Sequence, residues 1–547
     1  MRWLLGAFGL LSLVRWLRIE LPREYRFRKF HRRYGGMLAS RRPQSRPAKT
    51  ALLVSGPHTC LLVDLWLIRA LKLAGHATVV LTLGAKHWNR YYRLGGASEV
   101  YSWDDFKGSR VHLDEANAVV AQSPPLADLA RFEYAGARVG RVAASTTLRE
   151  LRLGSLDLKS SPHQQRHLAN LLSRSMSLTD ASRELLRRIA PDCAVLSDMV
   201  YVRRGELFDL CLHDRIPTVI WHPAHRNNSL ILKRYDLSNR EQHPVSLSPD
   251  SWRLIGQMPW TDAHRAELQR ELARAYSQGD WYGESGTQFS KRFAGHAEIR
   301  KQLGLDPAKK NAFIFPHIAW DAPLSWGESL FETYEQWLVE TVRAACRNDQ
   351  VNWVIKIHPA NVGKQLKERY AGEPAELTAL RRQVGALPPH VFLLRAESDI
   401  STFPLFELMD YCLTVRGTIG IEAASFGIPA ITAGTGRYDR RGFTIDSTSR
   451  EQYLDRIGRI QDIPPLSPAV RELAERFAYG IFLLRPFPLE TISLEFDKDI
   501  SAQDNFTRSR INAASNAEWD DAGDLHMLAE WLTVPGEADF LLPSRAG

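Results

Sequence analysis

Two strand-like runs near the middle of this 547-residue chain constrain its fold more than any other feature. The first covers residues 351–359 (VNWVIKIHP) and the second covers residues 411–416 (YCLTVR). Each run is apolar until its last residues, which include Lys356 and His358 in one and Arg416 in the other. Ligands of open α/β sheets bind at the carboxyl ends of the strands. We therefore expect these three side chains to face one ligand site at the edge of a parallel sheet.

Apolar strand-like runs alternate with helical runs in two separate blocks of the sequence, and this pattern predicts parallel sheets covered on both faces. A single hydrophobic core stops growing at about 250–300 residues, so the length also predicts two large domains. The predicted fold class is α/β, with two doubly wound Rossmann-like domains. The expected strands are 51–57, 78–84, 193–198, 216–222, 311–317, 351–358, 390–394, 411–415 and 430–433, and the expected helices include 61–73, 163–189, 206–213, 329–346, 361–370, 403–409 and 418–426.

These blocks predict four parts of the chain. Residues 1–49 form a basic arm, and residues 50–300 form a first domain that ends in a helical connector. Residues 305–480 form a second domain. Residues 481–547 form a helical tail with one amphipathic run at 517–532.

The positive charge of the chain lies in its N-terminal arm. Residues 1–49 have a net charge of +11, whereas the whole chain has +9, so the remaining residues sum to −2. The basic pI is therefore no evidence for nucleic-acid binding. The apolar run 3–14 is shorter than the ~20 residues of a transmembrane helix. It fits an interfacial helix on an anionic membrane surface; an ordinary docked helix and a disordered basic tail are the alternatives.

Several common sites are absent from the sequence. The five cysteines are scattered and form no CxxC pair, which disfavours structural zinc and disulfides and favours a reducing compartment. The chain lacks a P-loop and a GxGxxG after its first strand, so ATP hydrolysis and NAD chemistry are disfavoured. The segment Asp497-Lys-Asp499 resembles a metal-binding DxD, but a solvated loop is the better interpretation. We expect no metal and no cofactor.

The end of the 351–359 run has the composition of a phosphate site. Side chains alternate between the two faces of a strand, so Lys356 and His358 share one face. A buried parallel strand is normally apolar on both faces, and polar residues that break this rule concentrate at functional sites. The pattern favours a cation and an imidazole directed at a phosphate, unless the strand simply enters solvent there.

The turn after the 411–416 run adds further phosphate-binding features. Gly417 permits close backbone approach, and Thr418 is a candidate N-cap whose helix would offer free amides to an anion. Arg416 could contact the phosphate through two N–H groups. Glu422 lies one turn further on the same helix face and could hold a ribose. Alternatively, Glu422 only favours the helix dipole and Gly417 only serves the turn.

Two strand ends of the first domain supply candidate bases. Asp198 ends one predicted strand and His222 ends the next. A carboxylate or an imidazole at such a position can act as a general base. An ordinary surface loop at His222 is the alternative.

Taken together, residues 311–440 resemble the C-terminal domain of GT-B glycosyltransferases of the capsule and surface-polysaccharide type, including the group related to capsule Kdo transferases. The first domain is similar to their acceptor half. The residues that carry the resemblance are Phe315-Pro-His317, Trp320-Asp321, Lys356-Ile-His358-Pro359, the run from Arg416 to Glu422 and Phe426-Gly-Ile-Pro429, with Gly205-Glu206, Trp221-His222 and Lys233-Arg-Tyr235 in the first domain.

The resemblance implies a bacterial glycosyltransferase that moves a sugar from a nucleotide-activated donor to a capsule or other surface polysaccharide, free or lipid-linked. It implies a cytoplasmic protein held peripherally at the inner face of the membrane, with no metal requirement. The expected donor-binding residues are His317, Lys356, His358, Arg416, Gly417, Thr418 and Glu422, and the expected catalytic residues are Asp198, His222, His358 and Arg416.

Two other functions share parts of this pattern. Sugar-nucleotide 2-epimerases of the same fold also have the His-Pro strand and the Gly-Thr…Glu helix. A non-catalytic membrane-associated assembly factor would keep the arm and the fold without binding a nucleotide. Fold alone does not separate these from a transferase.

Overall fold

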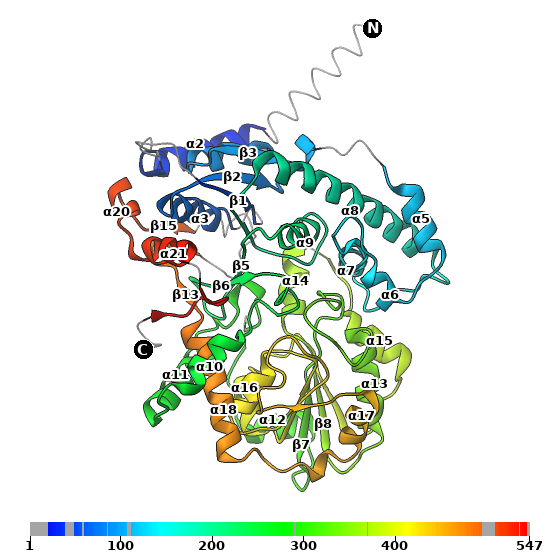
Figure 1. Ribbon diagram of the computed structural model, residues 1–547. Coiled ribbons are helices and arrows are strands. Elements are labelled where there is room, and N and C mark those ends of the chain that lie inside the picture. The colour runs from blue at the N-terminus through cyan, green and yellow to red at the C-terminus, as the bar shows by residue number, and fades with distance from the viewer. Residues whose placement is uncertain are drawn as a thin grey trace.

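Two sheets, each covered by its own helices, build two domains that face each other (Figure 1). The computed structural model describes residues 20–38, 49–56, 60–84, 86–106, 111–288, 291–368, 370–494, 509–534 and 536–543. The predicted fold class is confirmed, because both sheets have doubly wound strand orders built around a parallel core.

The first sheet has the order β13-β6-β5-β4-β1-β2-β3. Strands β1 to β5 run parallel, whereas β6 is antiparallel to β5 and β13 is antiparallel to β6. The two antiparallel strands were not predicted. The strands are β1 (Lys49–Val54), β2 (His76–Thr82), β3 (Glu99–Ser102), β4 (Cys193–Leu196), β5 (Thr218–Pro223), β6 (Ser229–Tyr235) and β13 (Phe487–Pro488).

Alternating apolar residues bury both faces of this sheet. Leu53, Val80 and Val195 belong to a core shared with α3, whereas Leu52, Leu81 and Leu196 point into the core beneath α8 and α9. The helices are α2 (Leu21–Leu38), α3 (Leu61–Leu73), α4 (Asn89–Leu94), α5 (Leu113–Ala121), α6 (Leu126–Arg131), α7 (Val139–Leu151), α8 (Pro162–Ile189) and α9 (Gly205–His213), with short 3-10 turns η3 (Lys86–Trp88) and η4 (Trp103–Phe106).

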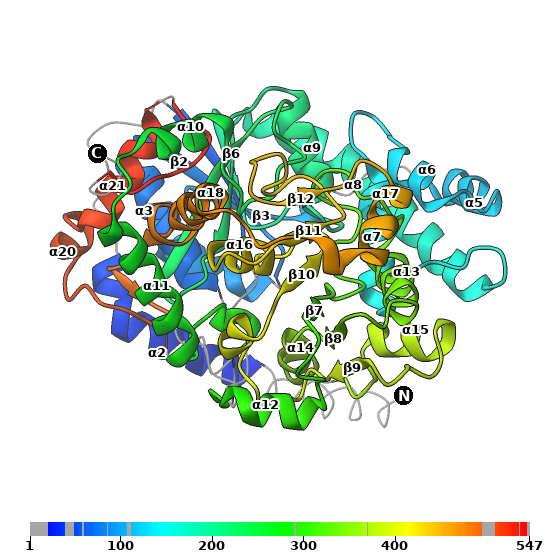
Figure 2. The ribbon, with the colours of Figure 1, turned by 90° about the horizontal axis from the view of Figure 1, so that it is seen from below.

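The second sheet has the order β12-β11-β10-β7-β8-β9, and all its strands are parallel. Helices α16 and α18 lie side by side on one face (Figure 2), and α13, α15 and α17 cover the other. The strands are β7 (Asn311–Ile314), β8 (Asn352–Lys356), β9 (Val391–Leu394), β10 (Tyr411–Thr414), β11 (Ala430–Thr432) and β12 (Ile445–Asp446). The helices are α13 (Tyr334–Cys346), α14 (Ala360–Glu368), α15 (Ala375–Gln383), α16 (Ile419–Ser425), α17 (Arg450–Gly458) and α18 (Pro468–Tyr479), with 3-10 turns η6 (Phe403–Glu407) and η7 (Ile460–Asp462).

The connector between the two sheets is helical, as the sequence predicts. It contains α10 (Pro249–Gln257), α11 (Asp262–Ser277), the 3-10 turn η5 (Gly283–Ser285) and α12 (His296–Leu303). Helices α10 and α11 both pack against α18, so this part of the connector lies against the second domain.

The last part of the chain returns to the first domain. After α18, a π-helical turn η8 (Gly480–Leu484) leads into β13, which extends the first sheet. The helix expected at 517–532 is two helices, α20 (Asn516–Asp520) and α21 (Gly523–Thr533), and α21 packs on α3. Strands β14 (Ile492–Ser493) and β15 (Arg510–Ile511) pair with each other. The segment expected as a helical tail therefore supplies part of the first domain's core.

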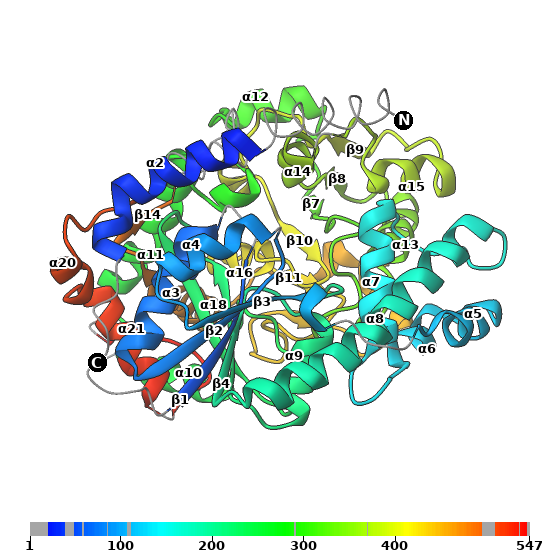
Figure 3. The ribbon, with the colours of Figure 1, turned by 90° about the horizontal axis from the view of Figure 1, so that it is seen from above.

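The described part of the N-terminal arm is a helix docked on the first domain. Phe30, Tyr34 and Leu38 of α2 are buried, and α2 lies against α4 (Figure 3). The apolar run 3–14 lies outside the described residues. In the part of the chain that the structure describes, no helix has the length and apolar character needed to cross a membrane.

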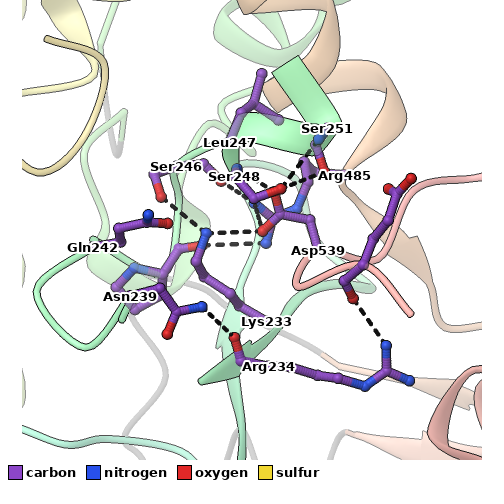
Figure 4. A network of polar contacts seen from close by, with 12 residues as sticks. Lys233, Arg234, Asn239, Gln242, Ser246, Leu247, Ser248, Ser251, Arg485 and Asp539 are labelled. Carbon is purple, nitrogen blue, oxygen red and sulfur yellow. Dashed lines mark hydrogen bonds and ion pairs between the residues drawn. The ribbon is translucent and has the colours of Figure 1, made fainter. Parts of the chain in front are cut away.

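A buried ionic network ties the C-terminal segment to β6 (Figure 4). Asp539 Oδ1 lies 2.9 Å from Lys233 Nζ and 3.1 Å from an Arg485 guanidinium nitrogen, and all three side chains are fully buried. Asp539 Oδ2 also accepts a hydrogen bond from the Ser248 amide. Burial alone would raise the pKa of Asp539, but Arg485 and Lys233 outweigh it and bring that pKa to about 2.

Replacing Asp539 by Asn should destabilise the protein by about 3–5 kcal/mol, because two buried cations would lose their counter-charge. Chemical denaturation measures this change. The control Asp521→Asn removes an exposed carboxylate after α20 and should change the free energy of unfolding by less than about 0.5 kcal/mol. Equal stability of the two variants would contradict the role given to the network.

Candidate functional site

A cavity of about 320 Å³ lies where the carboxyl ends of β7, β8 and β10 face the end of β5. It adjoins a larger cleft of about 980 Å³ against the first domain, and His222 and Asp321 line both. Asp198 lines the larger cleft. The structure therefore brings the predicted residues of the second domain together. Those that line the smaller cavity are His317, Lys356, His358, Arg416, Gly417, Thr418 and Glu422.

Lys356 is a buried cation with no counter-charge. It is the last residue of β8 and its side chain is 3% exposed. Burial, followed by the nearby charge of Lys291, lowers the pKa of the Lys356 ammonium to about 7. No hydrogen bond or ion pair joins it to any other described residue. A buried ammonium without a partner is costly, so this position favours an anionic ligand.

His358 lies on the same side of the strand end but contributes no charge. Burial, followed by Lys356 and Lys364, lowers the pKa of its imidazole to about 4. The Ala360 amide donates a hydrogen bond to Nδ1 at 3.2 Å, so the proton of the neutral ring must sit on Nε2. His358 thus offers a ligand one N–H donor and no positive charge.

His317 follows β7, and its imidazole is also neutral and carries one ring proton. The Arg416 amide donates to its Nε2 at 3.3 Å, which leaves the ring proton on Nδ1. Burial, followed by the charge of Arg416, lowers the pKa of His317 well below its usual range. Its ring stacks on Tyr334 with centroids 4.4 Å apart, so its orientation is fixed.

The Arg416 guanidinium mainly stabilises the loops around the cavity. Its two terminal nitrogens donate to the carbonyls of Ser325 at 3.1 Å and Glu328 at 3.0 Å. Each terminal nitrogen keeps a second N–H, and Nε has no partner among the described residues. The two-pronged contact with a phosphate therefore stays a prediction, while the two carbonyls, which no local pattern reveals, hold the guanidinium in place.

Helix α16 begins beside the cavity. Thr418 occupies its N-cap position but makes no capping hydrogen bond. The Tyr276 hydroxyl donates to Glu422, and burial raises the pKa of Glu422 to about 7. Gly420 leaves room for Tyr438, whose hydroxyl donates to the Gly417 carbonyl at 2.8 Å. Glu422 thus already accepts a hydrogen bond from Tyr276 of the connector, a contact that no sequence pattern predicted.

His222 faces the cavity from the first domain and offers a hydrogen-bond acceptor, whereas the histidines of the second domain offer donors. Its Nδ1 lies 2.9 Å from the Pro223 carbonyl, which can only accept, so Nδ1 carries the proton and Nε2 is an acceptor. Asp198 follows the neighbouring strand, but its carboxylate accepts from the Val200 amide and lies 3.5 Å from Arg204. Of the two predicted bases, His222 has the freer acceptor atom.

Arg437 and Asp321 line the cavity but were not predicted as site residues. Arg437 lines the cavity and donates to the carbonyls of Val245 and Arg416, both at 3.3 Å. Asp321 Oδ1 accepts from Arg149 and Tyr201 of the first domain, and its Oδ2 accepts from Lys364, each at 2.8 Å. The only sequence signals were the position of Arg437 after β11 and the Trp320-Asp321 pair.

Within the described ranges, no group of three or more His, Cys, Asp or Glu side chains is placed to hold a metal ion. The Asp497-Lys-Asp499 segment lies outside those ranges.

No family model and no curated protein matches this sequence. Solved structures with similar folds include KpsC of Thermosulfurimonas dismutans, a beta-Kdo 2,4 transferase, with 15% identity and a TM-score of 0.33 over 54% of this chain and 81% of that one. They also include the UDP-GlcNAc 2-epimerase of Neisseria meningitidis, with 12% identity and a TM-score of 0.27 over 79% and 95%. The calicheamicin glycosyltransferase CalG4 has 16% identity and a TM-score of 0.27 over 79% and 94%. Scores this low do not decide the activity.

Binding of a phosphate-containing nucleotide should weaken as pH rises above 7. The free Lys356 ammonium has a pKa of about 7 and loses its charge above that pH, whereas the second ionisation of a phosphate is already complete. Up to about tenfold weaker binding per pH unit is expected between pH 7 and 9. Calorimetric titration at each pH measures the affinity.

The matched variant is Lys356→Arg, whose guanidinium stays charged over this range and should flatten the profile. The same slope in both proteins would show that Lys356 does not bind the phosphate.

Proposed function

We propose that this protein transfers a sugar from a nucleotide-activated donor to an acceptor hydroxyl held in the cleft between its domains. One observation carries the proposal. Lys356, His358 and His317 present N–H donors from the second domain, whereas His222 presents an acceptor nitrogen from the first. This polarity suits a leaving phosphate on one side and a hydroxyl that must lose its proton on the other.

The chemistry follows from that arrangement. His222 Nε2 takes the proton of the acceptor hydroxyl as its oxygen bonds to the anomeric carbon of the donor. The bond from that carbon to the phosphate oxygen breaks, and the phosphate leaves with the electron pair. Lys356 and the two N–H donors stabilise the added negative charge, in a pocket where preorganised donors contribute most.

The large cleft favours a second substrate. Its volume of about 980 Å³ lies mainly against α7, the loop after β4 and the end of β5 in the first domain, beyond the donor cavity. A sugar-nucleotide 2-epimerase needs no acceptor, so this volume favours transfer. We propose a glycan, free or lipid-linked, of the capsule or surface-polysaccharide kind as the acceptor. Incubation with the donor alone separates the two reactions: an epimerase alters the sugar nucleotide, whereas a transferase requires the acceptor for turnover.

We also propose that α2 contributes to binding an anionic membrane surface. Its buried residues face the first domain, whereas a row of basic side chains and Tyr25 are exposed. Basic residues near an anionic surface each contribute about 1 kcal/mol. The exposed basic residues are Arg28, Lys29, Arg32 and Arg33.

His222→Ala should lower the rate of sugar transfer by about 10²–10⁴-fold, because the acceptor hydroxyl would lose its base. Nucleotide affinity should change little, since the phosphate contacts come from the second domain. A coupled assay of nucleotide release measures the rate, and the exposed histidine variant His213→Ala serves as the control. A near-normal rate in His222→Ala would exclude His222 as the base.

Replacing the four exposed basic residues of α2 by Gln should weaken binding to vesicles of phosphatidylglycerol and phosphatidylcholine by up to about 4 kcal/mol. Cosedimentation measures the bound fraction. The control removes the same charge elsewhere, at Lys301 of the connector and at Arg381, Arg382 and Arg395 of the second domain. Equal loss in both proteins would mean that only net charge matters and that α2 is not the membrane contact.

A further inference from the structure

Three arginines gather on the first-domain wall of the large cleft. Arg174 comes from α8, and Arg203 and Arg204 come from the loop between β4 and α9. Burial lowers the pKa of the Arg203 guanidinium, and the charges of Arg174 and Arg204 lower it further. The three side chains therefore repel one another in the absence of an anion.

Little in the described structure compensates this charge. The Arg174 and Arg203 guanidiniums make no hydrogen bond or ion pair with other described residues. Arg204 lies 3.5 Å from Asp198, and its buried Nε has no partner among the residues described. Two carboxylates attract the Arg203 charge: Glu150, which lines the cleft and lies 2.9 Å from His167, and the exposed Asp104.

One arginine of this cluster, Arg203, has a strained backbone conformation. Arg203 has a φ of +85°, which a residue other than glycine rarely adopts. The strain is maintained by the Glu206 carboxylate, which accepts from the Arg203 amide at 2.9 Å and from the Ser175 hydroxyl at 2.6 Å. Strain that the surroundings enforce is concentrated at ligand sites.

Two further buried donors line the same wall. Ser197 Oγ and Trp221 Nε1 have no hydrogen-bond partner among the described residues, and both residues border the cleft. Ser197 directly follows β4, and Trp221 precedes His222 on β5. Both residues therefore lie next to the proposed base.

We infer that Arg174, Arg203 and Arg204 form a phosphate subsite that holds a phosphate group of the acceptor near His222. Guanidinium groups match phosphate oxygens in geometry, and three of them exceed the charge of one carboxylate. The role of the phosphate as part of the acceptor depends on the proposed function, but the subsite itself does not. It is distinct from the donor site at Lys356, because it lies on the opposite domain.

Calorimetric titration of the full chain with inorganic phosphate, at constant ionic strength, tests this inference. Two sites are expected in the unaltered protein. Arg203→Gly removes one guanidinium and also relieves the positive φ, so it should keep or raise the melting temperature while weakening the first-domain site at least tenfold. If Arg203 had only a structural role, Arg203→Gly would not weaken phosphate binding while the melting temperature stays the same or rises. Arg187→Ala, an exposed change on the same helix as Arg174, is the control.

The arms of the experiment separate this inference from the proposed function. Lys356→Ala should remove the other site and leave the arginine site intact. Unchanged phosphate binding in an Arg174→Ala/Arg203→Gly variant would overturn the subsite, even if loss at Lys356 still supports the donor site. Glucuronate that binds the arginine site more tightly than phosphate would overturn the assignment to phosphate. A phosphorylated glycan acceptor should lose more of its affinity in Arg203→Gly than its unphosphorylated counterpart does.

Discussion

The buried contact of Asp539 with Lys233 and Arg485 holds the end of the chain on the first domain. It fixes the C-terminal segment beside β6 after the chain has passed through the second domain. The two sheets are therefore joined by two crossings of the chain, and their carboxyl edges stay face to face. Such a network contributes less to net stability than to specifying one arrangement, since each buried charge is costly to desolvate.

The cavity between the sheets also contains charge that is costly to desolvate. Lys356 is buried without a counter-charge, and three arginines crowd the opposite wall. Unsatisfied charge of this kind persists where a ligand provides the missing partner. Interdomain contacts through Asp321 keep these two walls together. The positively charged regions on both sides fit two anionic groups, one on each substrate, with His222 between them.

The sequence predicted the sheets well because apolar strands and helices alternate in a short, local pattern. The same local reasoning placed Lys356, His358 and His222 at strand ends, and all three line the cavity. It failed where long-range contacts decide. The pairing of β13 with β6 joins segments about 250 residues apart, although β6 itself pairs with β5, the strand directly before it in the chain. The partners of Arg416 and the protonation of His358 depend on loops and burial that no local pattern encodes.

The central claim is that the second domain binds the phosphate of an activated sugar through Lys356 and the two histidine N–H groups. A crystal structure with a bound nucleotide sugar tests it most directly. The account predicts phosphate oxygens within hydrogen-bonding distance of Lys356 Nζ and His358 Nε2, with the anomeric carbon turned toward His222. Phosphate bound elsewhere, with Lys356 left without a contact, would contradict it.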